Sequence, residues 1–315
     1  MTKYYAMIIF SVLLFSVQFV FTKCYQKERG SHFSASMLQL VLSSAFFIPF
    51  YFVLNKFKLE FTPFSFFIAT LYAINGMTCT VFGMKVLEKV NLSVYTLFLM
   101  LGGMIVPFIY GLFTGEELTI LKVLSVILVA LSLFIDLKKD GEKKIDFKLL
   151  LCCMMIFLTN GLAHVLTYIH QRSTLQTVST SSFLLLAFLC KMVICGVIFA
   201  VITYRAKQKQ QAESSADSNS NPDSEGVCAQ DKNRVFKSWM ITIGVIVGYV
   251  IVSGLAQWIS AYTAVYVDAG IKSTIITGGC IVMSAFFGLI FGEKITPVKV
   301  IQLVLALGGV VLMMR

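Results

Sequence analysis

Apolar residues along this chain form ten long runs, which are separated by mostly short polar segments. A helix needs roughly 20 residues to cross the hydrocarbon core of a bilayer, and each run approaches or exceeds that length. Because lipid offers backbone groups no hydrogen-bonding partners, we expect each run to be a transmembrane α-helix. The runs occupy residues 4–22, 34–54, 64–86, 92–113, 118–135, 148–169, 180–203, 238–263, 271–291 and 296–314. The pattern predicts an all-α integral membrane protein.

Two polar segments interrupt this pattern. Residues 136–148, DLKKDGEKKIDFK, form a charged linker at the midpoint of the chain. This linker separates residues 1–135 from residues 149–315, and each part contains five apolar runs. Residues 204–237 include AESSADSNSNPDSEG and have no apolar periodicity, so we expect them to form a disordered polar loop.

One phrase occurs in both parts of the chain. GLFTGEELTILKV begins at Gly111 and GLIFGEKITPVKV begins at Gly288, so identical residues recur at an offset of 177 positions. Because each part has an odd number of runs, the second part must enter the bilayer from the opposite side. We therefore predict ten transmembrane helices arranged as two inverted five-helix repeats. That architecture is typical of carriers with a binding site near the midplane, between the repeats.

Composition supports a membrane protein and excludes several other classes. Hydrophobic residues make up 57% of the chain and charged residues 13%, which is too apolar for a soluble domain. The net charge of +10 resides in short loops rather than in a basic domain, so no nucleic-acid partner is expected. Of the 26 Lys and Arg residues, 18 lie in the loops after the first, third, fifth, seventh and ninth runs. Positive loops tend to be cytoplasmic, so the termini, on the opposite side, are predicted to be outside.

No motif predicts an enzyme, a metal site or a cofactor. The eight cysteines show no CxxC or Cys/His spacing, and neither His-Glu-x-x-His nor a buried aspartate pair occurs. All sixteen acidic residues lie in loops or at the ends of runs. A proton-coupled carrier for cationic drugs would usually need a buried carboxylate, so such an exchanger is disfavoured.

Lys191 and His164 are the ionisable residues that lie deep within apolar runs. A charge at the bilayer centre costs at least about 2.5 kcal/mol, so such residues tend to face a cavity and serve function. His164 also belongs to a polar stripe on one side of its helix, and four other runs contain comparable stripes. Hydrogen bonds between helices explain single polar residues equally well. The predicted substrate-binding residues are Lys191 and, from the polar stripes, Gln18, Asn75, Asn160, His164, Tyr168, Gln257 and Thr277.

The repeated Gly-Glu pairs, at Gly115-Glu116 and Gly292-Glu293, predict turns rather than a substrate site. Glycine accepts the left-handed backbone that often ends a helix. The glutamate would then lie near the start of the fifth or tenth helix, where the helix dipole favours an anion.

The two segments VNLSVYTLFLMLGGMIVPFIYGLFTGEELT and VDAGIKSTIITGGCIVMSAFFGLIFGEKIT each end in Gly-Glu and are followed by one more apolar run. In these segments the chain resembles the drug/metabolite transporter superfamily, specifically its EamA-like ten-helix branch. The resemblance implies a bundle with a central cavity, alternating access for small solutes, and homodimers in some members. It also implies cytoplasmic termini, which conflicts with the distribution of Lys and Arg.

The expected function is a secondary transporter for a small polar metabolite, such as an amino acid or another carboxylate-bearing solute, in the cell membrane. Buried amides, hydroxyls, Lys191 and His164 would suit such a solute. A sugar or nucleotide-sugar transporter is the first alternative, although phosphate groups would call for more buried cations. A receptor or scaffold that uses residues 204–237 is the second alternative.

Overall fold

The computed structural model describes the chain except for residues 1, 31, 88–91, 138–146, 176, 217–227, 291–296 and 315. The described residues form ten α-helices, one for each predicted apolar run. The helices are α1 (Thr2–Arg29), α2 (Phe33–Leu54), α3 (Pro63–Leu87), α4 (Leu92–Phe113), α5 (Ile120–Leu137), α6 (Phe147–Arg172), α7 (Thr180–Ala216), α8 (Cys228–Thr263), α9 (Ala269–Ile290) and α10 (Pro297–Met313). The prediction of an all-α protein is confirmed.

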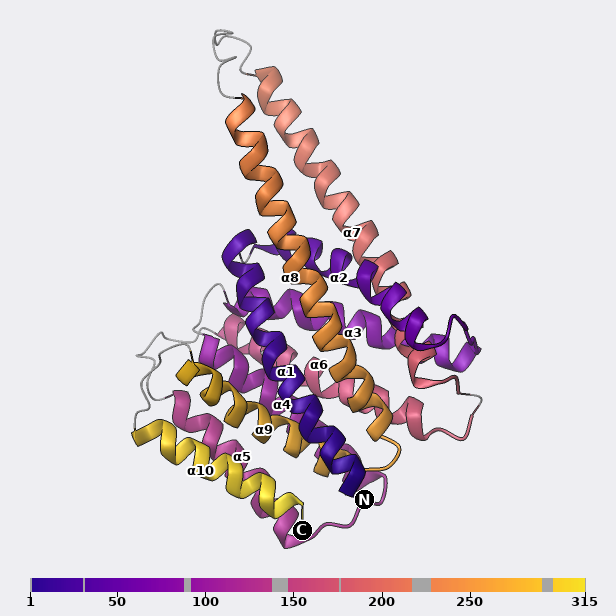
Figure 1. Ribbon diagram of the computed structural model, residues 1–315, viewed down its shortest axis with the longest axis vertical. Helices are drawn as coiled ribbons and strands as arrows, with labels where there is room; N and C mark the ends of the chain where they lie inside the picture. The colour runs from indigo at the N-terminus through magenta and orange to yellow at the C-terminus, as the bar shows by residue number, and fades with distance from the viewer. Residues whose placement is uncertain are drawn as a thin grey trace.

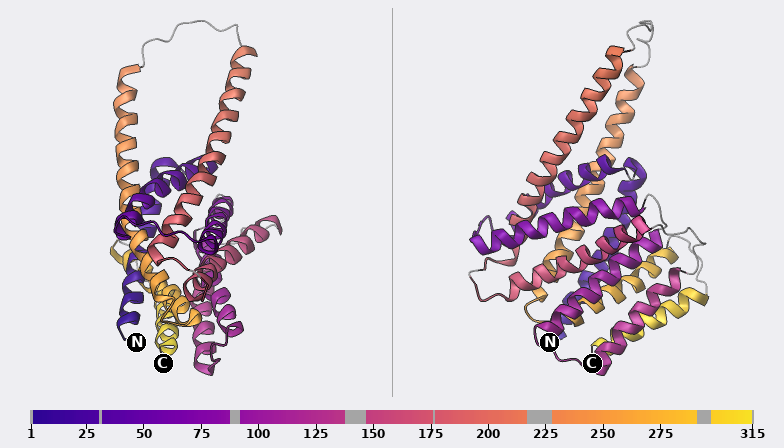
Figure 2. Two further views of the ribbon diagram at one scale, coloured as in Figure 1. Left: turned by 90° about the vertical axis from the view of Figure 1, so that its right-hand side faces the viewer. Right: turned by 180° about the vertical axis from the view of Figure 1, so that it is seen from behind.

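Helices α7 and α8 continue well beyond the bundle, at the end opposite to both termini (Figure 1, Figure 2). The expectation of disorder is therefore wrong for residues 204–216 and 228–237, which are helical. Ala, Lys, Gln, Arg and Glu are frequent in these segments and are good helix formers. Extending an existing helix also avoids the cost of nucleating a new one. Residues 217–227, like most of the charged linker, lie outside the described residues.

The most extensive helix packing joins the two parts of the chain. Helix α1 packs against α8 and α9, while α6 packs against α3 and α4. Helix α2 packs against α7, α4 against α9, and α5 against α10. The two five-helix parts therefore interleave, and each supplies much of the packing surface of the other.

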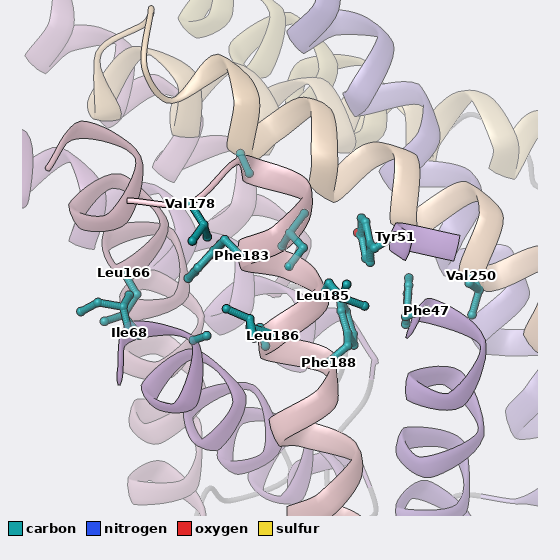
Figure 3. Close-up of a cluster of buried hydrophobic side chains, with 14 of the residues drawn as sticks. Phe47, Tyr51, Ile68, Leu166, Val178, Phe183, Leu185, Leu186, Phe188 and Val250 are labelled. Carbon is teal, nitrogen blue, oxygen red and sulfur yellow. The ribbon is translucent and has the colours of Figure 1, made fainter. Parts of the chain in front are cut away.

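The largest buried apolar cluster lies where α2, α3, α6, α7 and α8 meet (Figure 3). The rings of Phe47 on α2 and Phe188 on α7 stack with centroids 4.1 Å apart. The hydroxyl of Tyr51 donates to the carbonyl oxygen of Gly254 on α8, at 3.0 Å, so this buried polar atom is satisfied. Aromatic packing and this hydrogen bond fix α2, α7 and α8 around the centre of the bundle.

The outside of the bundle is strongly apolar. On α7 the outward residues Val193, Val197 and Val201 are 62%, 60% and 45% exposed, and they are spaced by one helical turn. Six of the described helices are long and apolar enough to cross a membrane, and four shorter apolar segments occur in α4, α5, α9 and α10. Such faces need lipid rather than water as their surroundings, so the chain is a multi-pass membrane protein.

Candidate functional site

Two of the predicted site amides hold helices together. The side-chain nitrogen of Asn75 on α3 donates to the carbonyl oxygen of Thr159 on α6, at 2.7 Å. That of Asn160 on α6 donates to the carbonyl oxygen of Leu99 on α4, at 2.6 Å. Both bonds satisfy polar groups in an apolar bundle, and they fix α6 between α3 and α4.

Glycines bring α4 and α6 unusually close to each other. A Cβ atom on Gly102 would overlap the carbonyl group of Phe157, and one on Gly161 would overlap Val106. A Cβ atom on Gly103 would lie 2.7 Å from the amide nitrogen of Asn160. Close backbone contact between membrane helices usually depends on such small residues. It brings the polar stripe of α6 directly against α4.

His164 lies one turn beyond Asn160 in the same stripe. Its Nε2 atom lies 3.5 Å from the place where a Cβ atom on Gly103 would be. The side chain is half-buried and has no hydrogen bond or ion pair with any described residue. This half-buried imidazole therefore has no polar partner among the described residues.

Lys191 lies in the first third of α7, near the middle of the apolar run 180–203, and points toward α3. Its Nζ atom lies 5.6 Å from the centre of the Phe188 ring and 3.6 Å from the position of a Cβ atom on Gly76. Within the described part of the chain it has no hydrogen bond, no ion pair and no carboxylate partner. The side chain is half-buried. An ammonium group removed from water usually has a carboxylate or hydrogen-bond acceptors beside it, and none is present here among the described residues.

Gln18, Gln257 and Thr277 also make no side-chain hydrogen bond to described residues. The Oε1 atom of Gln18 on α1 is buried and unpartnered. Gln257 on α8 is half-buried, and Thr277 on α9 is 3% exposed. The described contacts do not join these three residues to Lys191 or His164. Their placement in one binding site therefore stays a prediction.

Lys272 on α9 is a buried cation that the sequence analysis missed. It is 0% exposed, and its Nζ atom donates to the carbonyl oxygen of Ser260 on α8, at 2.8 Å. The same atom lies 4.4 Å above the centre of the Tyr168 ring, a cation–π contact. Lys272 lies at the edge of its apolar run, so sequence position alone suggested an interfacial residue. Packing against Tyr168 buries it instead.

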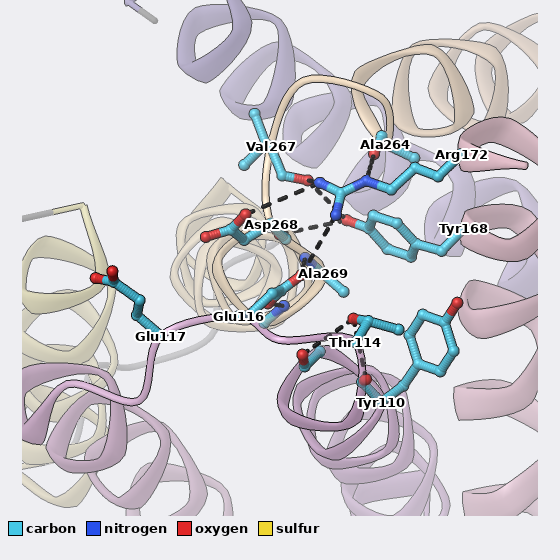
Figure 4. A network of polar contacts seen from close by, with 12 residues as sticks. Tyr110, Thr114, Glu116, Glu117, Tyr168, Arg172, Ala264, Val267, Asp268 and Ala269 are labelled. Carbon is cyan, nitrogen blue, oxygen red and sulfur yellow. Dashed lines mark hydrogen bonds and ion pairs between the residues drawn. The ribbon is translucent and has the colours of Figure 1, made fainter. Parts of the chain in front are cut away.

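Tyr168 contacts this buried lysine and also Arg172, at the bundle end that carries both termini. Figure 4 shows Tyr168 beside Arg172, Glu116 and Asp268. Its hydroxyl donates to the carbonyl oxygen of Asp268, at 3.3 Å. We call Glu116, Lys122, Arg172 and Asp268 the charge network. Arg172 lies 3.7 Å from a carboxylate oxygen of Glu116 and 3.9 Å from one of Asp268, and Lys122 lies 3.4 Å from Asp268.

The position of Glu116 corrects one expectation. Gly115 has a φ of 88°, so the predicted left-handed turn is present. The Glu116 carboxylate, however, accepts hydrogen bonds from the backbone amides of Ala269, at 2.7 Å, and Gly270, at 3.3 Å. It therefore caps α9 rather than α5. The Glu116 carboxylate does lie at the start of a helix, where the dipole favours an anion, but that helix is α9 and not the next helix in sequence, α5. The second pair, Gly292-Glu293, lies outside the described residues.

A second group of polar contacts joins the neighbouring loops at the same end. The backbone amide of Ser179 donates to a carboxylate oxygen of Glu60, at 2.6 Å. This hydrogen bond lowers the pKa of Glu60 below its usual range. Deeper in, the imidazole of His170 lies 2.9 Å from the hydroxyl of Ser65, and both side chains are fully buried. This hydrogen bond connects α3 and α6.

The charged and metal-ligating side chains of the described residues can be compared directly. They contain no group of His, Cys, Asp and Glu side chains that could bind a metal ion. Neither the half-buried His164 in the α6 stripe nor the buried Lys272 beside it pairs with a carboxylate among the described residues. Lys191 adds a third uncompensated base.

Known proteins resemble this chain in sequence over its first part and in fold over nearly its whole length. The EamA-like transporter family matches residues 2–136, and that match suggests transmembrane transport without specifying a substrate. A solved crystal structure of a protein superposes with a TM-score of 0.67 over 99% of this chain and 96% of the other, at 13% identity. That likeness shows a shared fold. No curated protein matches the sequence. Residues 2–136 of this chain are therefore similar to the EamA-like transporter family.

Proposed function

We propose that this protein is a secondary transporter for a small polar metabolite with a carboxylate group, such as an amino acid, in the cell membrane. The observation that carries the proposal is the half-buried Lys191, which has no acidic partner among the described residues. The family of residues 2–136 favours transport as the activity. A substrate carboxylate would form the ion pair that the protein itself does not provide.

The other proposed binding groups would recognise the uncharged parts of the solute. His164, Gln18, Gln257 and Thr277 have donors or acceptors that the described residues leave unused. Asn75, Asn160 and Tyr168 already bind backbone carbonyl oxygens. These three residues would position α6. The side-chain oxygens of Asn75 and Asn160 would still be able to accept hydrogen bonds from the solute.

We also propose that the chain is built from two inverted repeats that cross the membrane ten times. The helix pairs support this proposal, because the packing is reproduced when each helix is replaced by its counterpart in the other half, such as α1 by α6 and α8 by α3. The pair α1–α8 corresponds to α6–α3, and α1–α9 corresponds to α6–α4. The pairs α2–α7, α4–α9 and α5–α10 each map onto themselves. A two-fold relation of this kind would let one half rock against the other around a midplane site.

A nucleotide-sugar transporter is the second candidate function, and the burial of Lys272 favours it more than the sequence did. Lys191 and Lys272 provide two buried cations in the described spans. Lys272, however, is fully enclosed by Tyr168 and Ser260, which leaves one accessible ammonium group for a diphosphate. A single carboxylate matches the site better.

Thermal unfolding of the purified protein tests the function with a panel of amino acids, organic acids, sugars and nucleotide sugars. A ligand that binds the folded state stabilises it by about 2.7 kcal/mol at a concentration 100 times its Kd. We expect carboxylate compounds to raise the unfolding midpoint of the native protein and of Lys148→Met, an exposed lysine on α6. Lys191→Met should lose the increase.

A carboxylate compound that stabilises Lys191→Met as strongly as the native protein would contradict the role of Lys191. Stabilisation by nucleotide sugars alone would replace the proposed substrate class with the second candidate. Uptake of the active compound into proteoliposomes would then test transport directly.

A further inference from the structure

Arg172 makes more contacts than its place at the end of α6 requires. Its Nε atom donates to the carbonyl oxygen of Ala264, and Nη2 donates to that of Val267, both at 2.9 Å. The guanidinium group also lies near the carboxylates of Glu116 and Asp268 (Figure 4). One side chain therefore connects α6 with both the α4–α5 loop and the α8–α9 loop.

These contacts cross between the two parts of the chain. Glu116 and Lys122 belong to the first part, whereas Arg172 and Asp268 belong to the second. All three ion pairs found among the described residues lie in this one network. The bundle end with the termini, which we call the termini face, is thus closed by charges from both parts.

The charge network covers polar residues that lead inward along α6 and α9. Tyr168 lies directly below Arg172, with the guanidinium carbon 5.4 Å from the centre of its ring. Beneath Tyr168 lies Lys272, and the next residue, Ser273, is 1% exposed. His164 continues the same stripe toward the centre of the bundle. Removal of the network would uncover these groups in that order.

The network is suited to opening because its ion pairs are long and partly exposed. The distances are 3.4 Å, 3.7 Å and 3.9 Å, and the side chains of Arg172 and Asp268 are 35% and 40% exposed. Ion pairs exposed to water contribute little to stability individually, so they can break without unfolding the bundle. Glu116 would keep its hydrogen bonds to α9 when Arg172 leaves.

We propose that Arg172 is a latch. While it contacts Glu116 and Asp268 it keeps the termini face closed, and its release opens a route from that face to Lys272 and the polar stripe of α6. This latch would be one gate of the proposed transporter. Its test needs no substrate, so it can fail or succeed independently of the proposed function.

The experiment measures how fast a reporter cysteine beneath the latch reacts. Ser273 is suitable because its hydroxyl bonds only backbone carbonyl oxygens, those of Gly270 and Met104. Ser273→Cys is introduced after replacement of the eight native cysteines, and sealed vesicles of known orientation are treated with a membrane-impermeant maleimide. The latch variants are Arg172→Gln and Asp268→Asn. Lys148→Gln is the control, an exposed base at the other end of α6.

We expect Arg172→Gln to increase the labelling rate from the termini face by at least about tenfold, the factor for losing one charge-assisted hydrogen bond from the closed state. Asp268→Asn should increase the same rate by a smaller factor, and Lys148→Gln should leave it unchanged. The proposal is overturned if both latch variants label at the native rate. It is also overturned if labelling rises equally from both faces, because that result means general loosening. If Arg172→Gln does not fold, Asp268→Asn decides between these outcomes.

Discussion

At the residue scale, the carboxylate of Glu116 binds backbone amides that lie 153 and 154 residues later in the sequence. The first amides of a helix have no partner within the helix, and an acidic side chain satisfies them while favouring the dipole. Sequence reasoning recognised Glu116 as part of a turn. It could not find the helix that Glu116 caps, because that contact depends on how distant loops meet.

Glu116→Ala should lower the free energy of unfolding by about 0.5–2 kcal/mol, the range for loss of a helix cap. The matched control is Glu117→Ala, because the neighbouring carboxylate is exposed and points away from the charge network (Figure 4). Thermal unfolding in detergent compares the two variants. Equal stability of both variants would mean that the cap at α9 contributes nothing measurable.

The carboxylate of Glu60 makes stability depend on pH. Its pKa lies below the ordinary value of 4.5 because the amide of Ser179 donates to the charged form. Its contribution to stability is therefore fully present above that value, and it is lost as the pH falls through the lowered pKa. Glu60→Gln should be less stable than the native protein at neutral pH and should approach it below about pH 4.

Unfolding midpoints of both proteins, measured across a pH series, check this expectation. A stability difference that stays constant from neutral to acidic pH would mean that the charge of Glu60 is not the cause. A difference that grows on acidification would contradict the direction of the pKa shift.

At the element scale, contact between α4 and α6 depends on glycine. Gly102→Ala should reduce the free energy of unfolding by about 1–3 kcal/mol, because the added methyl group would overlap the backbone of Phe157. Gly308→Ala on α10 is the control, since nothing lies within 4 Å of its Cβ position. That variant should be neutral or gain up to about 1 kcal/mol from better helix propensity.

Thermal unfolding of the two glycine variants, side by side, measures the contrast. Similar losses in both would mean that glycine serves these helices for a reason other than close packing. A stable Gly102→Ala protein would show that α4 and α6 separate easily.

Helix lengths show where sequence patterns were sufficient and where they were not. The ten apolar runs gave the helices correctly, because backbone in lipid has few alternatives to a helix. Polar composition after residue 204 predicted disorder, yet α7 continues to Ala216. Apolar periodicity indicates a helix only where one side of it is buried. A helical extension that projects beyond the bundle has no such side, so its sequence shows no apolar periodicity.

At the scale of the whole molecule, the sequence predicted the all-α membrane fold and the resemblance of residues 2–136 to the EamA-like transporter family. It identified Lys191 and His164 as unusual, and neither makes a hydrogen bond or an ion pair with a described residue. It missed Lys272 because packing by Tyr168, rather than depth in an apolar run, buries that side chain. It also assigned Asn75 and Asn160 to the site, although their amide nitrogens donate to neighbouring helices. Periodicity shows which side of a helix is polar, but it does not show which helix packs against that side.

The interleaving of the two halves also affects biosynthesis. Asn75 on α3 finds its acceptor at Thr159, which is 84 residues further along the chain. At a synthesis rate of about 5–20 residues per second, the ribosome needs roughly 4–17 s to make that partner. During this interval α3 is in the membrane without α6 and α7, and the amide of Asn75 has only lipid, water or a passing helix to meet. The nascent first half is therefore the stage at which this protein most needs the protection of the insertion machinery.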